Sequence, residues 1–416
     1  MDRTAPGASS ALATWPLRDL DVPGLRRSGV RPVPFRQFVL KVRSRCNLAC
    51  SYCYIYEGAD STWRERPTQV TGATVRDTAA RIAEHVRTHR LTSVRVDLHG
   101  GEPLLGGAGP LLRHVTTLRE ALPANCAVDF GLQTNGTLLT TRALTDLTAA
   151  GIRVGLSLDG GSARHNLLRT DHGGRPAWPA VARAARLLAR HPGAYAGILC
   201  TIDLSNDATD VVSSLFELHP PALDLLLPHA NWSTPPPGVA PADPGMLRLP
   251  HDRPTPYGDW LAEAFDLWWA RRSRPSVRIR LFSEIIALLL GRPSVTEAVG
   301  LSPVATVVID TDGAIEQVDS LKTAYEGAPA TGLDVRRNSF DEALDHPGIA
   351  ARHLGRDALG PACRECPLVA VCGGGNYAHR YLALSGFRHP TVYCADMARL
   401  IRHVSDRLST EIGTSP

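Results

Sequence analysis

Short apolar segments with strand character alternate with helix-compatible segments from residue 35 to about residue 240. The first, Phe35 to Val42, precedes a segment from Thr71 to His89 that repeats apolar residues at helical spacing. Five further strand-like segments follow, each separated from the next by a helix-compatible stretch: 94–98, 127–132, 154–158, 196–202 and 223–227. Because strands that alternate with helices pair in parallel, the pattern predicts an α/β fold, an open and partial (β/α)6 version of the TIM-type barrel.

The bulk composition excludes several classes of protein. With 416 residues, of which 44% are apolar and 21% charged, the chain is an ordinary globular one, neither disordered nor fibrous. Its net charge of +4 arises from 45 basic and 41 acidic side chains, a balance that predicts no nucleic-acid partner. No apolar run reaches the length of a membrane span, and the N-terminus lacks a secretory signal, so we expect no membrane association and a cytoplasmic location.

Three regions are expected along the chain. Residues 1–34 are rich in Pro, Arg and Gly and form an N-terminal lead-in, and residues 35–273 form the barrel. An amphipathic helix with an aromatic face is predicted from Tyr257 to Arg272, near the end of the barrel. Residues 274–416, which include a strand predicted from Val304 to Ile309, form a separate C-terminal module.

Seven of the nine cysteines fall into two tight groups, a grouping that indicates metal ligation rather than disulfide pairing. Cys46, Cys50 and Cys53 lie in a short loop directly after the first predicted strand. Three thiolates on an iron–sulfur cubane leave one iron open to a ligand that the protein does not supply. Zinc sites with a remote fourth ligand use similar spacings, so the short spacing by itself leaves both metals open.

The spacing CxxxCxxC, with Tyr52 before the last cysteine, resembles the signature of the radical S-adenosylmethionine (SAM) superfamily. The resemblance implies a SAM-binding 4Fe–4S cluster on Cys46, Cys50 and Cys53. Further segments similar to the family's SAM-contacting motifs follow in order, each after a predicted strand, and they imply these cofactor-binding residues: Tyr52, Gly100, Gly101, Glu102, Gln133, Asn135, Ser157, Asp159 and Arg169.

Each of these motifs has a chemical rationale. Two glycines allow close backbone approach, and the carboxylate of Glu102 suits the ammonium group of SAM. The segments that begin at Gln133 and Ser157 resemble those that line the SAM ribose and carboxylate. Arg169 can grip a carboxylate with two parallel hydrogen bonds, which makes it a better candidate than the nearby His165.

The second group consists of Cys363, Cys366, Cys372 and Cys394, with three glycines after Cys372. Four thiolates can close a cluster, although a structural zinc uses the same CxxC pairs. The pattern resembles the SPASM extension of peptide-modifying radical SAM enzymes, which carries two auxiliary clusters. Asn376 stands where another cysteine is expected, and residues 312–322 contain none, so we expect one auxiliary 4Fe–4S cluster.

The chain from about residue 35 also resembles the FxsB group of radical SAM/SPASM peptide maturases. The similar stretches are FVLKVRSRCNLAC (38–50), LHGGEPLL (98–105), LLPHANW (226–232), DSLKTAYEGAPATG (319–332) and CGGGNYAHRY (372–381). This resemblance implies an oxidoreductase that acts on a ribosomally made precursor peptide. It joins an aromatic ring carbon to the Cβ of a residue two positions away, which yields a three-residue cyclophane. The implied electron donor is a flavodoxin or ferredoxin.

Such a crosslink requires abstraction of a Cβ hydrogen atom, attack on the ring, and loss of one proton and one electron. The auxiliary cluster is the expected electron acceptor, and Asp203 and Asp319 are the candidate bases. Formylglycine generation and thioether formation are alternative SPASM chemistries, and a zinc-stabilised interaction protein is the non-enzyme alternative. His229 and Trp232 either face substrate or are packed in the core.

Overall fold

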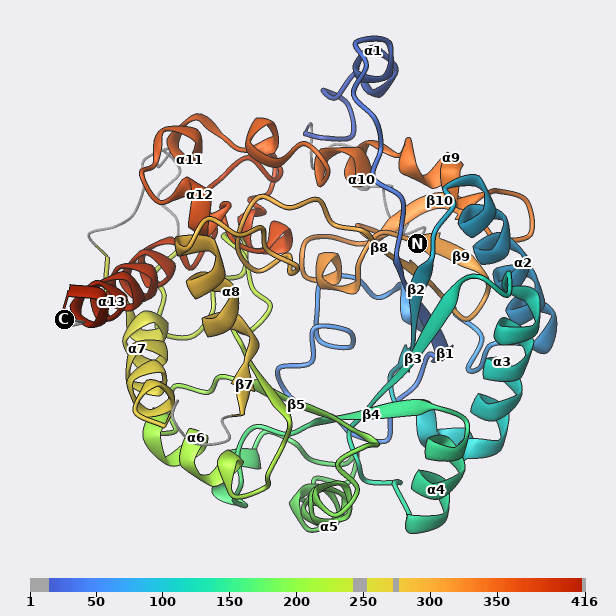
Figure 1. Ribbon diagram of the computed structural model, residues 1–416, viewed down its shortest axis with the longest axis horizontal. Helices are drawn as coiled ribbons and strands as arrows, with labels where there is room; N and C mark the ends of the chain where they lie inside the picture. Colours follow the sequence, from blue (N-terminus) through green and yellow to red (C-terminus); the bar gives the residue numbers. More distant parts are fainter. Residues whose placement is uncertain (1–14, 242–252, 272–276, 414–416) are drawn as a thin grey trace, which may run out of the picture.

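The computed structural model of the protein describes residues 15–241, 253–271 and 277–413. Its described strands form one sheet in the order β10-β9-β8-β1-β2-β3-β4-β5-β6-β7, which curves around a centre (Figure 1). The strand bounds are β1 Gln37–Arg43, β2 Ser93–Gly100, β3 Ala127–Thr134, β4 Ile152–Ser157, β5 Tyr195–Thr201, β6 Ala222–Leu226, β7 Arg278–Ile279, β8 Thr306–Ile309, β9 Ala314–Glu316 and β10 Ala330–Asp334. The first six strands pair in parallel, which confirms the predicted α/β partial barrel.

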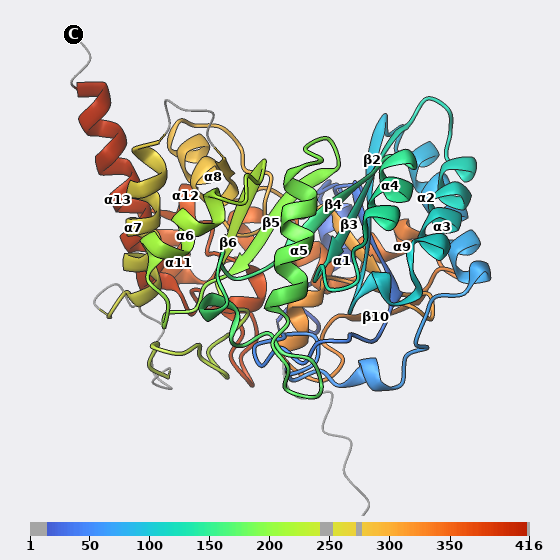
Figure 2. The ribbon, with the colours of Figure 1, turned by 90° about the horizontal axis from the view of Figure 1, so that it is seen from below.

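Helices cover the outer face of the curved sheet, as Figures 1 and 2 show. The helices that follow the barrel strands are α2 Gly72–Thr88, α3 Ala108–Ala121, α4 Thr141–Ala149, α5 Trp178–Ala189, α6 Ala208–Phe216 and α7 Pro256–Trp269. Thr71 caps α2, because its side chain accepts a hydrogen bond from the backbone of Thr74. The predicted helices at 71–89 and 257–272 correspond to α2 and α7, although residue 272 lies outside the described residues.

The C-terminal region completes the same sheet. β7 pairs in parallel with β6, β8 pairs in parallel with β1, and β9 and β10 continue antiparallel. The helices of this region are α8 Arg280–Leu289, α9 Phe340–Leu344, α10 Pro347–Ala351, α11 Pro361–Glu365, α12 Val369–Cys372 and α13 Cys394–Gly413. The predicted division at residues 273 and 274 lies outside the described residues, so the separate C-terminal module stays a prediction.

The N-terminal lead-in is described only from residue 15 onward. It contains the short helix α1, Val22–Arg27, and it places Trp15 in an apolar cluster with Leu321, Tyr377 and Phe387 of the C-terminal region. None of the described helices has the length and apolar character that crossing a membrane requires.

The long helix α13 packs against α7, and a glycine sets how closely the two approach. A Cβ atom at Gly258 would lie 2.7 Å from the carbonyl oxygen of Asp396 and 2.8 Å from its Cα. The carboxylate of Asp396 accepts hydrogen bonds of 2.9 Å from the backbone N–H groups of Tyr257 and Gly258, and so caps α7. Burial raises the pKa of Asp396 to about 6.

Replacing Gly258 by Ala is expected to destabilise the protein by about 1–3 kcal/mol, because the added methyl group forces α13 away from α7. Gly109→Ala is the matched control, because Gly109 also lies near a helix start but its Cβ would meet only Arg113 at 3.7 Å. That change should be neutral or stabilise by up to about 1 kcal/mol. Urea unfolding measures both, and equal stabilities for the two variants would contradict the packing argument.

Candidate active site at the carboxyl ends of the strands

The loop with Cys46, Cys50 and Cys53 follows β1 and lies against residues 168–171. Backbone hydrogen bonds from Ala49 to Thr170 (2.7 Å) and from Ser51 to Leu168 (3.2 Å) hold it there. The three thiols are half-buried. Burial raises the pKa of all three, that of Cys46 to about 11. The loop therefore gathers three neutral thiols that lose their protons when they bind a metal.

Donor groups point at one sulfur of this loop. Sγ of Cys46 accepts from the backbone N–H of Leu48 (3.4 Å) and from the side-chain amide of Asn135 (3.6 Å), which lies just beyond β3. The same amide donates to Asn47 at 3.0 Å. Asn135 is thus positioned against the cysteine loop by its own hydrogen bonds, and these N–H groups suit a thiolate that ligates a cluster.

Glu102 is fully buried at the end of β2, where three donors surround its carboxylate. Oε1 accepts from Leu104 N (2.9 Å) and from the hydroxyl of Thr134 (2.8 Å), and Oε2 accepts from Asn135 N (2.8 Å). Burial nevertheless raises the pKa of Glu102. The sequence analysis missed Thr134, which fixes the carboxylate from the neighbouring strand; a single hydroxyl carries no distinct sequence signal.

The two glycines before Glu102 have a packing role that the motif alone did not reveal. A Cβ at Gly100 would lie 2.1 Å from the carbonyl oxygen of Arg43, and one at Gly101 would lie 2.4 Å from that of Arg45. Gly100 also adopts a positive φ of 138°. The close backbone approach expected here therefore includes the end of β1 and the loop that follows it, which the glycines allow to lie directly against the end of β2.

Tyr52, Asp159 and Arg169 form one buried cluster beside the cysteine loop. The phenol of Tyr52 donates a short hydrogen bond to Asp159, and Arg169 donates to the phenol oxygen at 2.8 Å. The other oxygen of Asp159 accepts from Thr201 N at 3.1 Å. Arg169 is 5% exposed, yet its Nε has no hydrogen-bond partner among the described residues. An unpaired buried guanidinium nitrogen suits an anionic group such as the SAM carboxylate.

The remaining predicted SAM contacts lie on adjacent strands. The side-chain amide of Gln133, on β3, donates to the hydroxyl of Ser157, on β4, at 2.8 Å. A Cβ at Gly155 would lie 2.2 Å from Oε1 of Gln133, so this glycine makes room for the glutamine. Gln133 and Ser157 therefore act as a pair along the same strand ends.

The two candidate bases lie in different surroundings. Asp203 is half-buried in a turn after β5, where it accepts from the backbone and hydroxyl of Ser205 at 2.9 and 2.8 Å. Asp319 is buried in a short 3-10 helix and forms a 2.6 Å ion pair with Lys41 of β1. A carboxylate held by an ammonium group must give up that pairing to accept a proton, so Asp203 is the freer of the two.

Lys41 is the centre of a buried ionic cluster that sequence analysis missed. Besides Asp319, its ammonium lies 3.1 Å from Asp310 and 3.3 Å from Glu316. Burial lowers the pKa of Lys41, but the surrounding carboxylates outweigh this effect and raise it well above its usual value. Lys322, also buried, pairs with Asp60 at 2.6 Å. Three of these charged residues, Glu316, Asp319 and Lys322, lie in the segment of residues 312–322, which contains no cysteine.

The four C-terminal cysteines line one cavity of about 330 Å³, together with Leu368, Val369, Gly374, Thr391 and Ala398. Burial raises the pKa of Cys363 to about 12, and the positive charge of Arg380 opposes this effect. The guanidinium of Arg380 donates to the carbonyl oxygens of Gly373, Gly374 and Gly375, at 2.8, 3.0 and 2.7 Å. It therefore shapes the glycine loop that follows Cys372.

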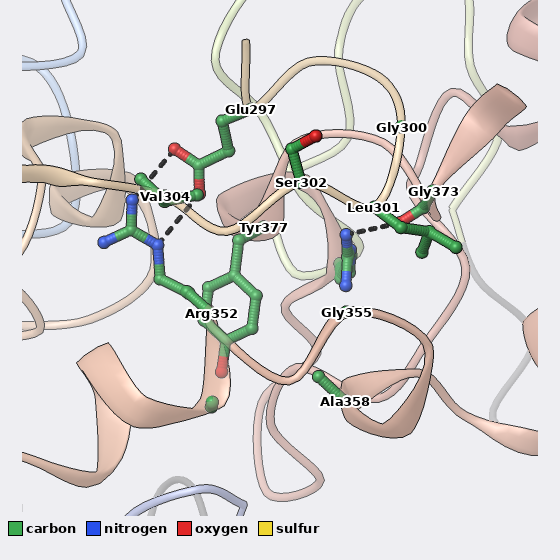
Figure 3. Close-up of a pocket in the computed structure, with 12 residues that line it drawn as sticks. Glu297, Gly300, Leu301, Ser302, Val304, Arg352, Gly355, Ala358, Gly373 and Tyr377 are labelled. Atoms are coloured by element: carbon green, nitrogen blue, oxygen red, sulfur yellow. Dashed lines mark hydrogen bonds and ion pairs between the residues drawn. The ribbon is translucent and has the colours of Figure 1, made fainter. Parts of the chain in front are cut away.

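A neighbouring pocket of about 390 Å³ shares Gly373 and Arg380 with this region (Figure 3). In it, Arg352 forms a bidentate pair with Glu297, at 2.9 and 3.0 Å, beside the ring of Tyr377. The pair joins the loop before β8 to the end of α10. Buried pairs of this kind specify how two segments meet more than they add stability.

A line of aromatic rings connects the two cysteine groups. Tyr54, next to Cys53, lies 4.6 Å from His229 between ring centroids; His229 contacts His379, and His379 lies 5.1 Å from Tyr393, which precedes Cys394. His229 and His379 are hydrogen-bonded at 3.0 Å. For His229 and Trp232, the sequence left open whether they face substrate or pack in the core. His229 lines a cavity of about 620 Å³, whereas Trp232 is buried and its indole N–H donates to the carbonyl of Pro390.

Comparisons with known proteins agree with this arrangement. Residues 40–203 match the model of the Radical SAM superfamily. The chain is 27% identical over 346 residues to a cysteine-type anaerobic sulfatase-maturating enzyme of Clostridium perfringens, which covers 82% of this chain and 88% of the relative. It is 30% identical over 166 residues, 38% of each chain, to the serine-type enzyme of Klebsiella aerogenes.

Solved structures share the fold over most of the chain. The structure of native anSMEcpe with bound AdoMet and the Kp18Cys peptide has a TM-score of 0.74 at 20% identity, and covers 91% of this chain and 99% of its own. Streptococcus suis SuiB bound to precursor peptide SuiA has a TM-score of 0.55 at 14% identity, over 88% of this chain and 77% of its own.

The family match assigns residues 40–203 to the Radical SAM superfamily, whose members bind SAM and a 4Fe–4S cluster, and the protein is an enzyme. Over most of its length, the chain is similar to the anaerobic sulfatase-maturating enzymes. The superfamily prediction is confirmed, whereas membership of the FxsB group stays a prediction.

Glu102→Gln is expected to weaken SAM binding about tenfold or more and to destabilise the protein by about 1–3 kcal/mol. The substitution puts an NH2 group among donors that all need an acceptor. Calorimetric SAM titration and urea unfolding measure the two effects. Glu84→Gln, at an exposed pair with Arg81, is the control and should change stability by less than about 1 kcal/mol. Unchanged SAM affinity would remove Glu102 from the binding site.

Lys41→Met is expected to destabilise the protein by about 3–5 kcal/mol at pH 7, because Asp319 loses its counter-ion while Asp310 and Glu316 keep only their pairs with Arg66 and Lys322. Lys41 lowers the pKa of Asp310 and of Glu316 in opposition to burial, so both values rise in the variant. A folded state with raised carboxyl pKa values binds more protons than the unfolded state. The loss in free energy of unfolding relative to the wild type should therefore shrink as the pH falls from 7 towards 5.

The control is Arg95→Met, which breaks the more exposed pair with Asp97 and should cost at most about 1 kcal/mol with little dependence on pH. Chemical unfolding at several pH values measures both variants. If the loss in free energy of unfolding of Lys41→Met stays constant across this pH range, the buried-cluster argument is contradicted.

Proposed function

We propose that the protein is a maturase that oxidises a side chain of a peptide or protein substrate, and that the formation of formylglycine from Ser or Cys is its reaction. The similarity to a cysteine-type anaerobic sulfatase-maturating enzyme extends over 82% of this chain and 88% of the relative. A matching structure of the same fold holds AdoMet and a peptide. The observation that carries the proposal is the convergence of a three-thiol loop with Glu102, Asp159 and Arg169 at the carboxyl ends of the strands.

The donor set of the cysteine loop suits an iron–sulfur cluster. Three half-buried thiols lie on one short loop, and the N–H groups of Leu48 and Asn135 are directed at Sγ of Cys46, as hydrogen bonds to the sulfurs of such clusters are. Cys46, Cys50 and Cys53 would hold the 4Fe–4S cluster, which with bound SAM supplies a radical that abstracts a hydrogen atom from the substrate. Arg169 and Glu102 would hold the SAM carboxylate and ammonium, and Gln133, Asn135, Ser157 and Asp159 would line the rest of its site.

The C-terminal cysteines fit one auxiliary cluster in the same way. Four thiols line one cavity, and the buried guanidinium of Arg380 holds the glycine loop that follows one of them, Cys372. Oxidation of the substrate requires loss of one electron and one proton after hydrogen abstraction. An auxiliary 4Fe–4S cluster on Cys363, Cys366, Cys372 and Cys394 would accept the electron. Asp203 would accept the proton, with Asp319 as the second candidate, and a flavodoxin or ferredoxin would supply the initial electron.

A second candidate reaction is the three-residue cyclophane crosslink. It is favoured by the ion pairs of Lys41 with Asp319 and of Lys322 with Asp60. Asp319 and Lys322 lie in the segment where a full SPASM module has cysteines for a second iron–sulfur cluster. Asn376, in the position of a further expected cysteine, accepts an N-cap hydrogen bond of 3.0 Å from the backbone N–H of Ala378. Both reactions need a hydrogen abstraction followed by loss of an electron and a proton, so the same residues serve either.

Anaerobically reconstituted protein is expected to bind about eight iron atoms and to release 5'-deoxyadenosine with a strong reductant. Incubation with peptides that contain Ser, Cys and aromatic residues should yield a product two hydrogens lighter at Ser, with an aldehyde that reacts with hydrazide. A product that fragments as a crosslinked ring and has no aldehyde would select the cyclophane. Absence of iron or of 5'-deoxyadenosine would overturn the proposal.

Variants separate the two cysteine groups. Cys46→Ala should abolish 5'-deoxyadenosine, whereas the double variant Cys363→Ala and Cys366→Ala should bind about four fewer iron atoms and lose the oxidised product. Cys126→Ala removes a buried cysteine outside both groups and is the control, with unchanged iron content. Oxidised product at the normal rate from the double variant would exclude the auxiliary cluster as electron acceptor.

A further inference from the structure

Two histidines and an aspartate converge on the outer side of the barrel, away from both cysteine groups. His85 and His89 are four residues apart at the end of α2, so their rings share one helix face, with centroids 4.5 Å apart. Asp341 lies in the first turn of α9, which packs against α2 (Figure 1). Because His89 precedes β2, the cluster lies at the opposite end of the strands from the Cys46 loop.

The ligand atoms of these residues are already close together. Oδ1 of Asp341 lies 2.6 Å from Nδ1 of His85 and 2.8 Å from Nε2 of His89. No other group of three histidine, cysteine or carboxylate ligand atoms in the described part of the chain lies within 4.8 Å of one another. A tetrahedral metal ion bound at about 2.0–2.2 Å to each atom holds its ligand atoms roughly 3.3–3.6 Å apart, so the carboxylate oxygen would have to move away from each ring nitrogen by about 0.5–1 Å.

The surroundings hold one side of the cluster and leave the other open. His85 is 1% exposed and packs against the rings of Phe35, Phe38 and Phe340. The side chains of His89 and Asp341 are 22% and 38% exposed. Their exposure allows them to shift and lets water complete the coordination of an ion, as in sites where protein supplies only part of the ligand set.

One carboxylate oxygen of Asp341 faces a ring nitrogen of each histidine, Nδ1 of His85 and Nε2 of His89. Imidazole nitrogens and carboxylate oxygens are ligand atoms that zinc binds. A bound ion would replace the two hydrogen bonds of the carboxylate and displace their protons.

We propose that His85, His89 and Asp341 bind one divalent transition-metal ion, and that their ligand chemistry favours zinc. The ion joins α2 of the barrel to α9 of the C-terminal region and is structural. This site is separate from the iron–sulfur chemistry and does not rest on the proposed reaction.

The test uses tag-free, full-length protein reconstituted with iron and sulfide, so that the cysteines are occupied, and then cleared of loose metal with a chelator. Zinc chloride titration by calorimetry should show one site that His89→Ala and Asp341→Asn each weaken at least tenfold. Zinc should also raise the thermal unfolding midpoint of the wild type but not of these variants. The iron content, measured afterwards, shows that zinc has not entered the cysteine groups.

His403→Ala is the matched control, because His403 forms a single imidazole–carboxylate pair with Asp266 at 2.8 Å between α13 and α7. It removes a comparable helix contact and should leave zinc binding unchanged. His89 and Asp341 are partly exposed, so their variants should fold even if His85→Ala does not. Equal zinc binding by the wild type, His89→Ala and Asp341→Asn, or no zinc binding by the wild type, would overturn the proposal. The three residues would then only join α2 to α9 through hydrogen bonds.

Discussion

The ammonium group of Lys41 ties together the two parts of the sequence that meet in the middle of the sheet. It projects from β1 and pairs with Asp310, Glu316 and Asp319, which belong to the segment from β8 to the 3-10 helix after β9. Buried carboxylates without a counter-ion are strongly destabilising, so these segments have to lie beside β1. The Cys46 loop follows β1 at once, and its position therefore depends on where the C-terminal strands dock.

A second buried cation has the same role at the other cysteine group. Arg380 binds three successive glycine carbonyls and thereby fixes the loop after Cys372. Positive φ angles at all three glycines, from 61° to 80°, allow the carbonyls to turn towards one guanidinium. The fold therefore builds both thiol groups on loops whose shape is set by buried positive charge.

The sequence predicts the barrel well because its signals are local. Six apolar strands, the helices at α2 and α7 and the strand β8 all follow from periodicity within one segment. The hydrogen bond between His229 and His379 joins residues 150 positions apart, and the Lys41 cluster joins β1 to residues more than 260 positions later. Such contacts leave no local pattern, so neither was predicted.

For the same reason, motif residues were located correctly while some of their contacts were not foreseen. Gly100 and Gly101 were expected to allow close backbone approach, and the atoms nearest to their Cβ positions belong to Arg43 at the end of β1 and to the loop that follows it. β9 and β10 extend the barrel sheet, a pairing that the sequence did not predict. A strand's partner depends on long-range pairing, which composition and spacing do not specify.

The burial of the thiols means that a metal cluster has to displace protons when it binds. Metal ligation needs thiolates, yet burial raises the thiol pKa values in both groups, to about 11 at Cys46 and about 12 at Cys363. One buried arginine opposes this effect in each group: Arg169 lowers the pKa of Cys50, and Arg380 that of Cys363, although burial dominates. Binding of a cluster must therefore displace protons from sites that are already folded around cationic groups. The two arginines thus favour the thiolate forms of nearby cysteines before any cofactor is bound. Because both arginines are buried, the packing of the fold sets where this electrostatic effect is exerted.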